Sequence, residues 1–186
     1  MNRSYFLSNI NCMAMAMLLV TANPAMPADT DSLELAVKAT FLYKFQFYIT
    51  WPPRAFAAGT DPFNLCIVGD DPFGDLIDQA VNGQTAGGHR VAVRRLRAVS
   101  AADHCQMMYL ATDDPQLARR ELSAVGGLPV LTVTDAIDDD SAKGMINFVV
   151  ADDRVRFEID NAQAARNGLA VSSKLLGVAL AVRTTP

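Results

Sequence analysis

The sequence predicts an α/β fold: a single three-layer domain in which a mixed, mostly parallel sheet is flanked by helices and ends in a C-terminal β-hairpin. Short apolar runs typical of strands alternate with helical segments between positions 64 and 133, and this alternation favours parallel strands between two layers of helices. Two further strand-like runs, at 145–150 and 154–159, are separated by a short polar break, which favours an antiparallel hairpin. A length of 186 residues suits one such domain.

The N-terminal 28 residues predict a secretory signal peptide. Arg3 is the only charged side chain before position 29, and an apolar run at 13–22 is followed by small residues, the order of features found in such peptides. The run is too short to span a bilayer. Cleavage after Ala25 and cleavage after Ala28 both fit the pattern. We therefore expect residues 29–186 to form one exported domain.

The folded domain should begin with a helix that ends near Thr50. Asp31 fits an N-cap with an acid, Glu34, three residues later. The helix should stop before Trp51, because the two prolines that follow cannot continue it. Trp51 is the only tryptophan, and it either packs over the helix end or contacts a partner or ligand. Apolar residues recur at helical spacing in this segment: Leu33, Val37, Phe41, Leu42, Phe45 and Ile49.

The two cysteines that remain after cleavage indicate which strands are neighbours. Cys66 lies in the first predicted strand and Cys105 just before the third. An even number of cysteines in an exported protein favours a disulfide over two free thiols. Because a bridge needs close Cα atoms, the first and third strands should be adjacent, as in a 2-1-3 doubly wound order. The four central strands are expected at 64–68, 90–96, 106–111 and 130–133, with helices ending near Val81 and Gly126 between them.

The hairpin and the segments after it complete the predicted fold. In 154–159 the residues alternate strictly, so Val155, Phe157 and Ile159 should face the core while Arg154, Arg156 and Glu158 face solvent. Asn161 should then cap a short helix that ends at Gly168. A closing helix should run from Ser172 or Ser173 to Val182.

Several function classes have little support in the residues. The net charge of −4 argues against broad nucleic-acid binding. The sequence has no His-x-x-x-His pair and no Gly-x-Ser-x-Gly elbow, which are the usual marks of zinc sites and of many hydrolases. Asp70, Asp71 and Asp113 follow predicted strands as in a magnesium-binding receiver domain, and 138–140 is an acidic loop that could hold calcium. Turns and solvated loops explain these acids better, and we expect no enzymatic activity and no cofactor.

Several segments together resemble the YfiR family. The C-terminal signature is carried by Gly-Met-Ile-Asn-Phe-Val at 144–149, by Arg-Val-Arg-Phe-Glu-Ile at 154–159 and by Leu-Ala-Val-Ser-Ser-Lys-Leu-Leu at 169–176. Further matching pieces lie at 38–45, 51–52, 62–69, 71–74 and 130–135. The resemblance extends from about Leu35 to Val182, and Cys66 and Cys105 match a cysteine pair that is bridged in the family.

The resemblance implies a non-enzymatic periplasmic regulator. Such a protein represses an inner-membrane diguanylate cyclase by binding the periplasmic region of that enzyme. An OmpA-like outer-membrane lipoprotein can sequester the repressor. Proteins of this family also tend to form homodimers. Trp51, Arg156 and Glu158 are the expected partner or ligand surface. The alternative is a periplasmic small-molecule-binding sensor, which an apolar pocket with Arg156 or Glu158 at its rim would favour.

Overall fold

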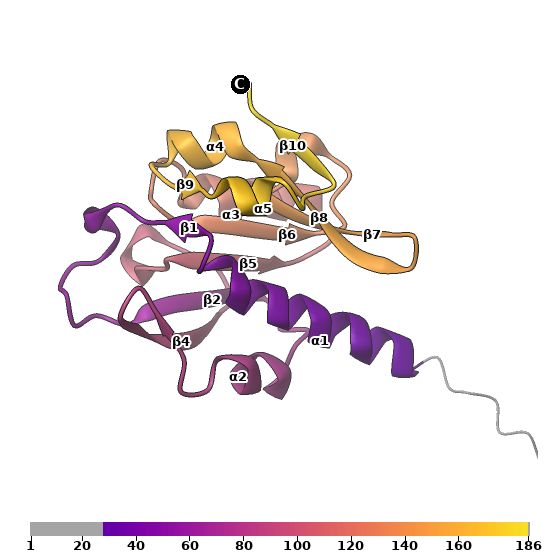
Figure 1. Cartoon of the computed structure of the whole chain (residues 1–186), viewed down its shortest axis with the longest axis horizontal. Helices are drawn as coiled ribbons and strands as arrows, with labels where there is room; N and C mark the ends of the chain where they lie inside the picture. The colour runs from indigo at the N-terminus through magenta and orange to yellow at the C-terminus, as the bar shows by residue number, and fades with distance from the viewer. Residues whose placement is uncertain (1–27, 186) are drawn as a thin grey trace, which may run out of the picture.

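The computed structural model describes residues 28–185, so all but the last residue of the predicted signal peptide lies outside the described residues (Figure 1). An eight-stranded sheet has the order β10-β8-β7-β6-β5-β2-β4-β3, and a separate pair joins β1 to β9. The predicted α/β class, with its mixed, mostly parallel sheet and C-terminal hairpin, is confirmed.

The strands are β1 (Ile49–Thr50), β2 (Phe63–Gly69), β3 (Thr85–Ala86), β4 (His89–Leu96), β5 (Met107–Ala111), β6 (Leu131–Asp135), β7 (Ile146–Ala151), β8 (Arg154–Asp160), β9 (Ala170–Val171) and β10 (Ala181–Arg183). The helices are α1 (Ala28–Phe45), α2 (Asp75–Val81), α3 (Pro115–Ala124), α4 (Asn161–Arg166) and α5 (Ser173–Leu176), with 3-10 turns η1 (Pro53–Ala55), η2 (Ala101–Asp103) and η3 (Asp140–Ala142).

The centre of the sheet has the predicted 2-1-3 order. Strand β2 lies between β4 and β5 and is parallel to both, and β6 and β7 continue the parallel arrangement. The disulfide between Cys66 and Cys105 joins β2 to the chain just before β5, with the two Cα atoms 5.9 Å apart. The cysteine pair therefore links neighbouring strands, as the sequence predicts.

Helices cover both faces of the sheet. On the face seen from the front in Figure 1, α1, α2, α4 and α5 pack on one apolar cluster that includes Leu42, Phe45 and Ile77. On the opposite face, α3 contributes Ala118 to a second cluster around the disulfide. Burial of these two clusters supplies the main driving force for folding, because removal of apolar surface from water dominates folding free energy.

Four phenylalanine rings join α1 to the hairpin. Phe41 and Phe45 of α1 contact Phe148 of β7 and Phe157 of β8, with ring centroids 5.2 to 6.1 Å apart. Phe157 and Ile159 are buried, as the alternation in β8 predicts. The outward face of β8 is less exposed than expected: Arg154 is exposed, but Arg156 and Glu158 are half-buried.

The first helix differs from its predicted limits at both ends. It begins at Ala28, before the predicted cap at Asp31, and it ends at Phe45 rather than near Thr50. Ile49 lies in β1 and pairs with Val171 of β9 instead of continuing the helix. The β-branched side chain of Ile49 suits an extended backbone, and its partner strand is distant in sequence.

The predicted closing helix is wrong beyond its first turn. Ser172 caps α5 as expected, accepting a hydrogen bond from the Lys174 backbone N–H at 3.3 Å, but α5 ends at Leu176. The chain then forms β10, parallel to β8, beginning where the Leu180 N–H donates to the Phe157 carbonyl at 2.8 Å. The unpaired edge of β8 offers backbone hydrogen bonds that a continued helix would leave unmade.

The predicted N-cap of the preceding helix is displaced by one residue. The carboxylate of Asp160, rather than the side chain of Asn161, caps α4 by accepting a hydrogen bond from the Gln163 N–H at 2.8 Å. Asp is as good an N-cap as Asn, so the last residue of β8 fills this position.

The disulfide should be formed in the native protein. Thiol labelling of denatured, unreduced protein should modify neither Cys66 nor Cys105. Replacing both by alanine should lower the free energy of unfolding by about 4 kcal/mol, because the bridge closes a loop of 39 residues and restricts the unfolded chain. Quantitative labelling of both positions would contradict the assignment.

Truncation of Phe157 should cause one of the largest losses in the free energy of unfolding. Phe157→Ala should lower the free energy of unfolding in urea by roughly 3–5 kcal/mol, because it leaves a cavity among the four rings. Arg154→Ala, on the exposed face of the same strand, should change stability by no more than about 0.5 kcal/mol. Equal effects of the two substitutions would show that the strand faces are assigned wrongly.

Candidate functional site

The carboxyl ends of the parallel strands, where many α/β proteins bind ligands, are filled by side chains in this protein. Phe73 follows β2 and packs edge-on against Tyr109 of β5, with ring centroids 4.8 Å apart. Asp71 accepts hydrogen bonds from the Phe73 N–H at 2.8 Å and from Arg95 at 2.7 Å, so its carboxylate organises the turn. Across residues 28–185, no three His, Cys, Asp or Glu side chains are grouped so that they could hold a metal ion.

A buried ionic cluster ties α1 to the same end of the sheet. Lys38, only 4% exposed, donates to Asp135 at 2.6 Å and to Glu34 at 2.5 Å, and the Tyr109 hydroxyl donates to Asp135 at 3.0 Å. Burial alone would lower the pKa of Lys38, but the hydrogen bonds and charges of Asp135 and Glu34 together raise it above its ordinary value. Burial, followed by the charge of Asp135, raises the pKa of Tyr109. The cluster anchors the helix, since its groups are engaged with one another.

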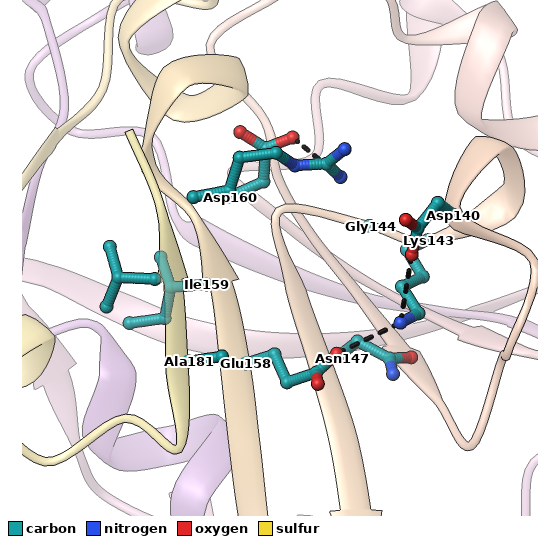
Figure 2. Close-up of a pocket in the computed structure, with 10 residues that line it drawn as sticks. Asp140, Lys143, Gly144, Asn147, Glu158, Ile159, Asp160 and Ala181 are labelled. Atoms are coloured by element: carbon teal, nitrogen blue, oxygen red, sulfur yellow. Dashed lines mark hydrogen bonds and ion pairs between the residues drawn. The ribbon is translucent and has the colours of Figure 1, made fainter. Parts of the chain in front are cut away.

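A polar site lies on the outward face of the hairpin. We call it the hairpin groove: a depression of about 250 Å³ beside β7, β8 and β10, with charged side chains on its walls (Figure 2). Lys143 donates to Glu158 at 3.0 Å and pairs with Asp140 at 3.1 Å, while Arg183 pairs with Asp160 at 3.2 Å. Its lining residues are Asp140, Lys143, Gly144, Asn147, Glu158, Ile159, Asp160, Ala181, Val182 and Arg183.

The strand pattern explains why these charges gather there. Residues of β8 alternate, so the burial of Phe157 against α1 directs Arg156, Glu158 and Asp160 to the opposite face. Asn147 of β7 supports the floor of the groove: it is buried, and its side-chain oxygen accepts a hydrogen bond from the Thr134 hydroxyl at 2.8 Å. The groove is therefore built on regular strands, which hold side chains in defined positions.

Charged side chains of both signs lie at the groove, and not all of them have an ion-pair partner. Burial opposes the charge of Lys143, yet the hydrogen bonds that it donates to Glu158 and Asp140, together with their charges, raise its pKa. Arg156 lies two residues before Glu158 on the same face of β8, just outside the residues that line the groove. It is half-buried, and its side chain makes no hydrogen bond or ion pair with any residue from 28 to 185. A partly desolvated cation without a partner is a favourable contact for an incoming carboxylate.

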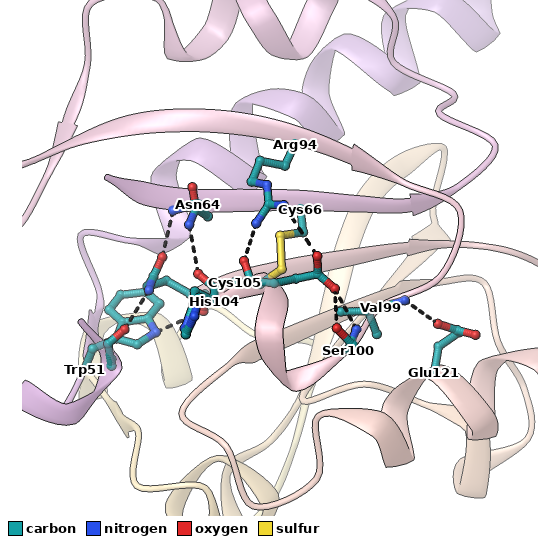
Figure 3. Close-up of a disulfide and its surroundings, with 12 residues drawn as sticks. Trp51, Asn64, Cys66, Arg94, Val99, Ser100, His104, Cys105 and Glu121 are labelled. Atoms are coloured by element: carbon teal, nitrogen blue, oxygen red, sulfur yellow. Dashed lines mark hydrogen bonds and ion pairs between the residues drawn. A yellow bond between two sulfur atoms is a disulfide. The ribbon is translucent and has the colours of Figure 1, made fainter. Parts of the chain in front are cut away.

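Trp51 lies in a different pocket from Glu158. Its indole N–H donates to the Gln106 carbonyl at 3.0 Å, and its ring packs edge-on against Phe63 with centroids 5.0 Å apart. Figure 3 shows the indole beside the chain segment that carries Cys105. Trp51 also lines an aromatic pocket of about 260 Å³ together with Phe56 and His89. The structure thus places Glu158 in the hairpin groove, Arg156 on the same face of β8 outside the lining of the groove, and Trp51 in a separate pocket.

Sequence reasoning missed three charged residues of the groove: Lys143, Asp160 and Arg183. Asp160 continues the alternation of Arg156 and Glu158, and this pattern could have identified it. No local sequence pattern identifies Lys143 or Arg183, because the pairing of strands that are distant in sequence brings each of them to the groove.

The ionic anchor of α1 should contribute strongly to stability. Lys38→Met should lower the free energy of unfolding by roughly 3–5 kcal/mol, because the largely buried Asp135 carboxylate loses its cation. Adding Asp135→Asn should recover part of the loss, since asparagine removes the charge and still accepts a hydrogen bond from Tyr109. Urea unfolding at neutral pH measures both variants, and a double variant no more stable than the single one would contradict the pairing.

The same anchor should show a defined pH dependence. Because the pKa of Lys38 is raised in the folded state, its stabilising contribution is complete below the ordinary value of 10.5 and is lost as the pH rises through the folded-state value. The stability difference between the wild type and Lys38→Met should therefore narrow only in buffers above pH 10.5. A difference that disappears near neutral pH would contradict this assignment.

Comparison with known protein families gives one match that covers most of the domain. The model of the domain family DUF4154, described as YfiR/HmsC-like, matches residues 35–180. The matched range begins in α1 and ends just before β10, so it includes the disulfide, the Lys38–Asp135 ion pair and seven of the ten residues that line the hairpin groove. Within 28–185 no helix has the length and apolar content needed to cross a membrane. The chain belongs to the YfiR/HmsC-like family.

Proposed function

We propose that this protein is a non-enzymatic periplasmic repressor that binds the periplasmic region of an inner-membrane diguanylate cyclase and lowers its activity. Membership of the YfiR/HmsC-like family across residues 35–180 carries this proposal. The filled strand ends support it, because side chains occupy the place where an α/β enzyme commonly binds its substrate. The signal-peptide pattern before residue 29 supports a periplasmic location.

The hairpin groove is the surface that we assign to the cyclase. Its Glu158 and Asp160 side chains are half-buried and held on β8, so a partner would meet them with little loss of conformational freedom. Arg156 offers an unpaired cation, and Glu158 offers a carboxylate whose internal partner Lys143 is itself accessible at the groove. Charged groups arranged in this way determine which partner binds and how fast it associates.

A second partner would account for release of the repressed enzyme. We assign this role to an OmpA-like outer-membrane lipoprotein that sequesters the repressor. A repressor held at the outer membrane cannot reach a cyclase in the inner membrane, so the lipoprotein need not occupy the same groove. The alternating charges of the groove are nonetheless suited to either contact.

The ligand-binding alternative has one specific observation in its favour. The pocket beside Trp51 is walled by aromatic side chains, and the Phe56 ring stacks on the His89 ring with centroids 3.9 Å apart. Apolar pockets with a few polar groups are the usual form of small-molecule sites. This pocket shares no lining residue with the hairpin groove, so ligand binding there and repression through the groove are separable functions.

Charge reversal in the groove should weaken repression without unfolding the protein. Deleting the gene should raise intracellular cyclic-di-GMP, and the wild-type protein should restore the low level. Glu158→Lys should restore it only partly, because it repels cationic groups of the partner and breaks the contact with Lys143. Lys143 keeps its ion pair with the exposed Asp140, so the loss of its contact with Glu158 should cost only about 1 kcal/mol of stability.

Asp113→Lys is the matched control. It makes the same charge change at an exposed residue outside the groove, and it should repress like the wild type. If deletion leaves cyclic-di-GMP unchanged under several envelope stresses, the cyclase proposal is wrong. If deletion raises the level but Glu158→Lys and Asp113→Lys behave alike, the function stands and the groove assignment fails.

A further inference from the structure

The pocket beside Trp51, which we call the Trp51 pocket, adjoins the end of the sheet opposite to the filled strand ends. Phe63 and His89, which line it, are the first residues of the parallel strands β2 and β4. The rest of the lining comes from the chain around β1 and from β3 with the turn after it, and the pocket has a volume of about 260 Å³. The lining residues are Gln46, Ile49, Thr50, Trp51, Phe56, Phe63, Ala86, Gly87 and His89.

Aromatic rings and a lack of charge define what this pocket can accept. Four of the lining side chains are aromatic rings, and such walls favour a flat aromatic ligand through stacked and edge-on contacts. Among the described residues that line the pocket, none is Asp, Glu, Lys or Arg. A charged ligand would therefore lose its hydration without gaining a counter-charge. The volume lies below the roughly 300 Å³ at which pockets for drug-sized molecules begin, so it suits a molecule of two fused rings.

Two hydrogen-bond acceptors in the lining have no donor. Gln46 is only 7% exposed, and its amide nitrogen donates to the Thr85 carbonyl at 3.3 Å. The amide oxygen of Gln46 accepts no hydrogen bond from any residue in 28–185. The His89 Nδ1–H donates to the Asp61 carbonyl at 2.6 Å, which leaves Nε2 of the neutral ring as an acceptor, also without a donor in that range. A ligand that brings an N–H into the pocket would satisfy one of these acceptors.

The turn between β3 and β4 leaves one side of the pocket without a side chain. Gly87 and Gly88 have φ values of +57° and +91°, a backbone conformation that glycine adopts readily in a two-residue hairpin turn. A Cβ atom at Gly87 would meet nothing within 4 Å. The turn therefore contributes backbone to the lining and no side chain that would close the pocket.

We propose that the Trp51 pocket binds a neutral, planar bicyclic heteroaromatic molecule that carries an N–H donor. The rings of the ligand lie among the aromatic side chains, and its N–H donates to the Gln46 oxygen or to Nε2 of His89. This gives the ligand class for the binding function described above as separable from repression. It does not rest on repression, because the pocket shares no lining residue with the hairpin groove.

Fluorescence of the purified exported protein tests the ligand class. Trp51 is the only tryptophan in the chain, so its emission reports on the pocket. Benzimidazole should change the emission in a saturable way with a sub-millimolar dissociation constant, and calorimetry should give the same constant. N-methylbenzimidazole, which has no N–H, should bind about 10-fold more weakly, since that ratio corresponds to roughly one lost hydrogen bond. A carboxylate-substituted benzimidazole should not bind at concentrations that saturate the site with the neutral molecule.

This ligand series uses the unaltered protein, so its outcome does not depend on the folding of any variant. No saturable signal by either method, or equal affinity for the three molecules, would overturn the proposal.

Substitutions test the placement of the ligand. His89→Phe keeps a ring that can stack on Phe56, Gln46→Met keeps a side chain of similar volume, and each removes one acceptor. At least one of them should weaken benzimidazole binding about 10-fold and leave N-methylbenzimidazole binding unchanged. A general distortion of the pocket would weaken both molecules. Phe56→Ala should weaken both, whereas Phe47→Ala should bind like the wild type, because Phe47 is 59% exposed and outside the pocket.

The outcomes separate this site from the hairpin groove. If neither acceptor variant distinguishes the two molecules, or if Phe56→Ala and Phe47→Ala behave alike, the assignment of the site is wrong. Glu158→Lys, in the groove, should bind benzimidazole like the wild type. Circular dichroism checks that each variant folds. Failure of ligand binding and failure of repression are therefore observed independently.

Discussion

Packing of four phenylalanine rings between α1 and the hairpin is the constraint on which the rest of the structure depends. Phe157 and Phe148 direct one face of the hairpin toward Phe41 and Phe45, so the charged residues of β8 must point to the other side. The same contact fixes the side of α1 that is buried. The position of the hairpin groove therefore follows from one hydrophobic contact.

Two further interactions, a disulfide and an ion pair, join parts of the domain at defined positions, which apolar packing alone does more loosely. The disulfide joins β2 to the start of β5, and the ion pair between Lys38 and Asp135 joins α1 to the end of β6. A buried ion pair contributes little net stability compared with apolar residues, but breaking it is costly. We infer that its role is to fix the position of α1 along the sheet.

The two faces of the hairpin have different roles. One face supplies the core and the other supplies the groove, so stability and partner recognition depend on different residues of the same strand. A substitution on the outward face of β8 can therefore alter the groove while it leaves the apolar contacts of Phe157 with α1 in place.

The sequence by itself determined the fold class, the four central strands, the order of the first three and the buried face of β8, because these depend on local periodicity and on one cysteine pair. It also selected Arg156 and Glu158, whose alternation places them on one face. Only the tertiary structure decided that Ile49 and residues 181–183 are extended: their strand partners are distant along the chain, and the open edge of β8 outweighs the helical pattern of the last segment. Convergence of Lys143 and Arg183 on the groove depends on the same long-range pairing, for which no local pattern exists.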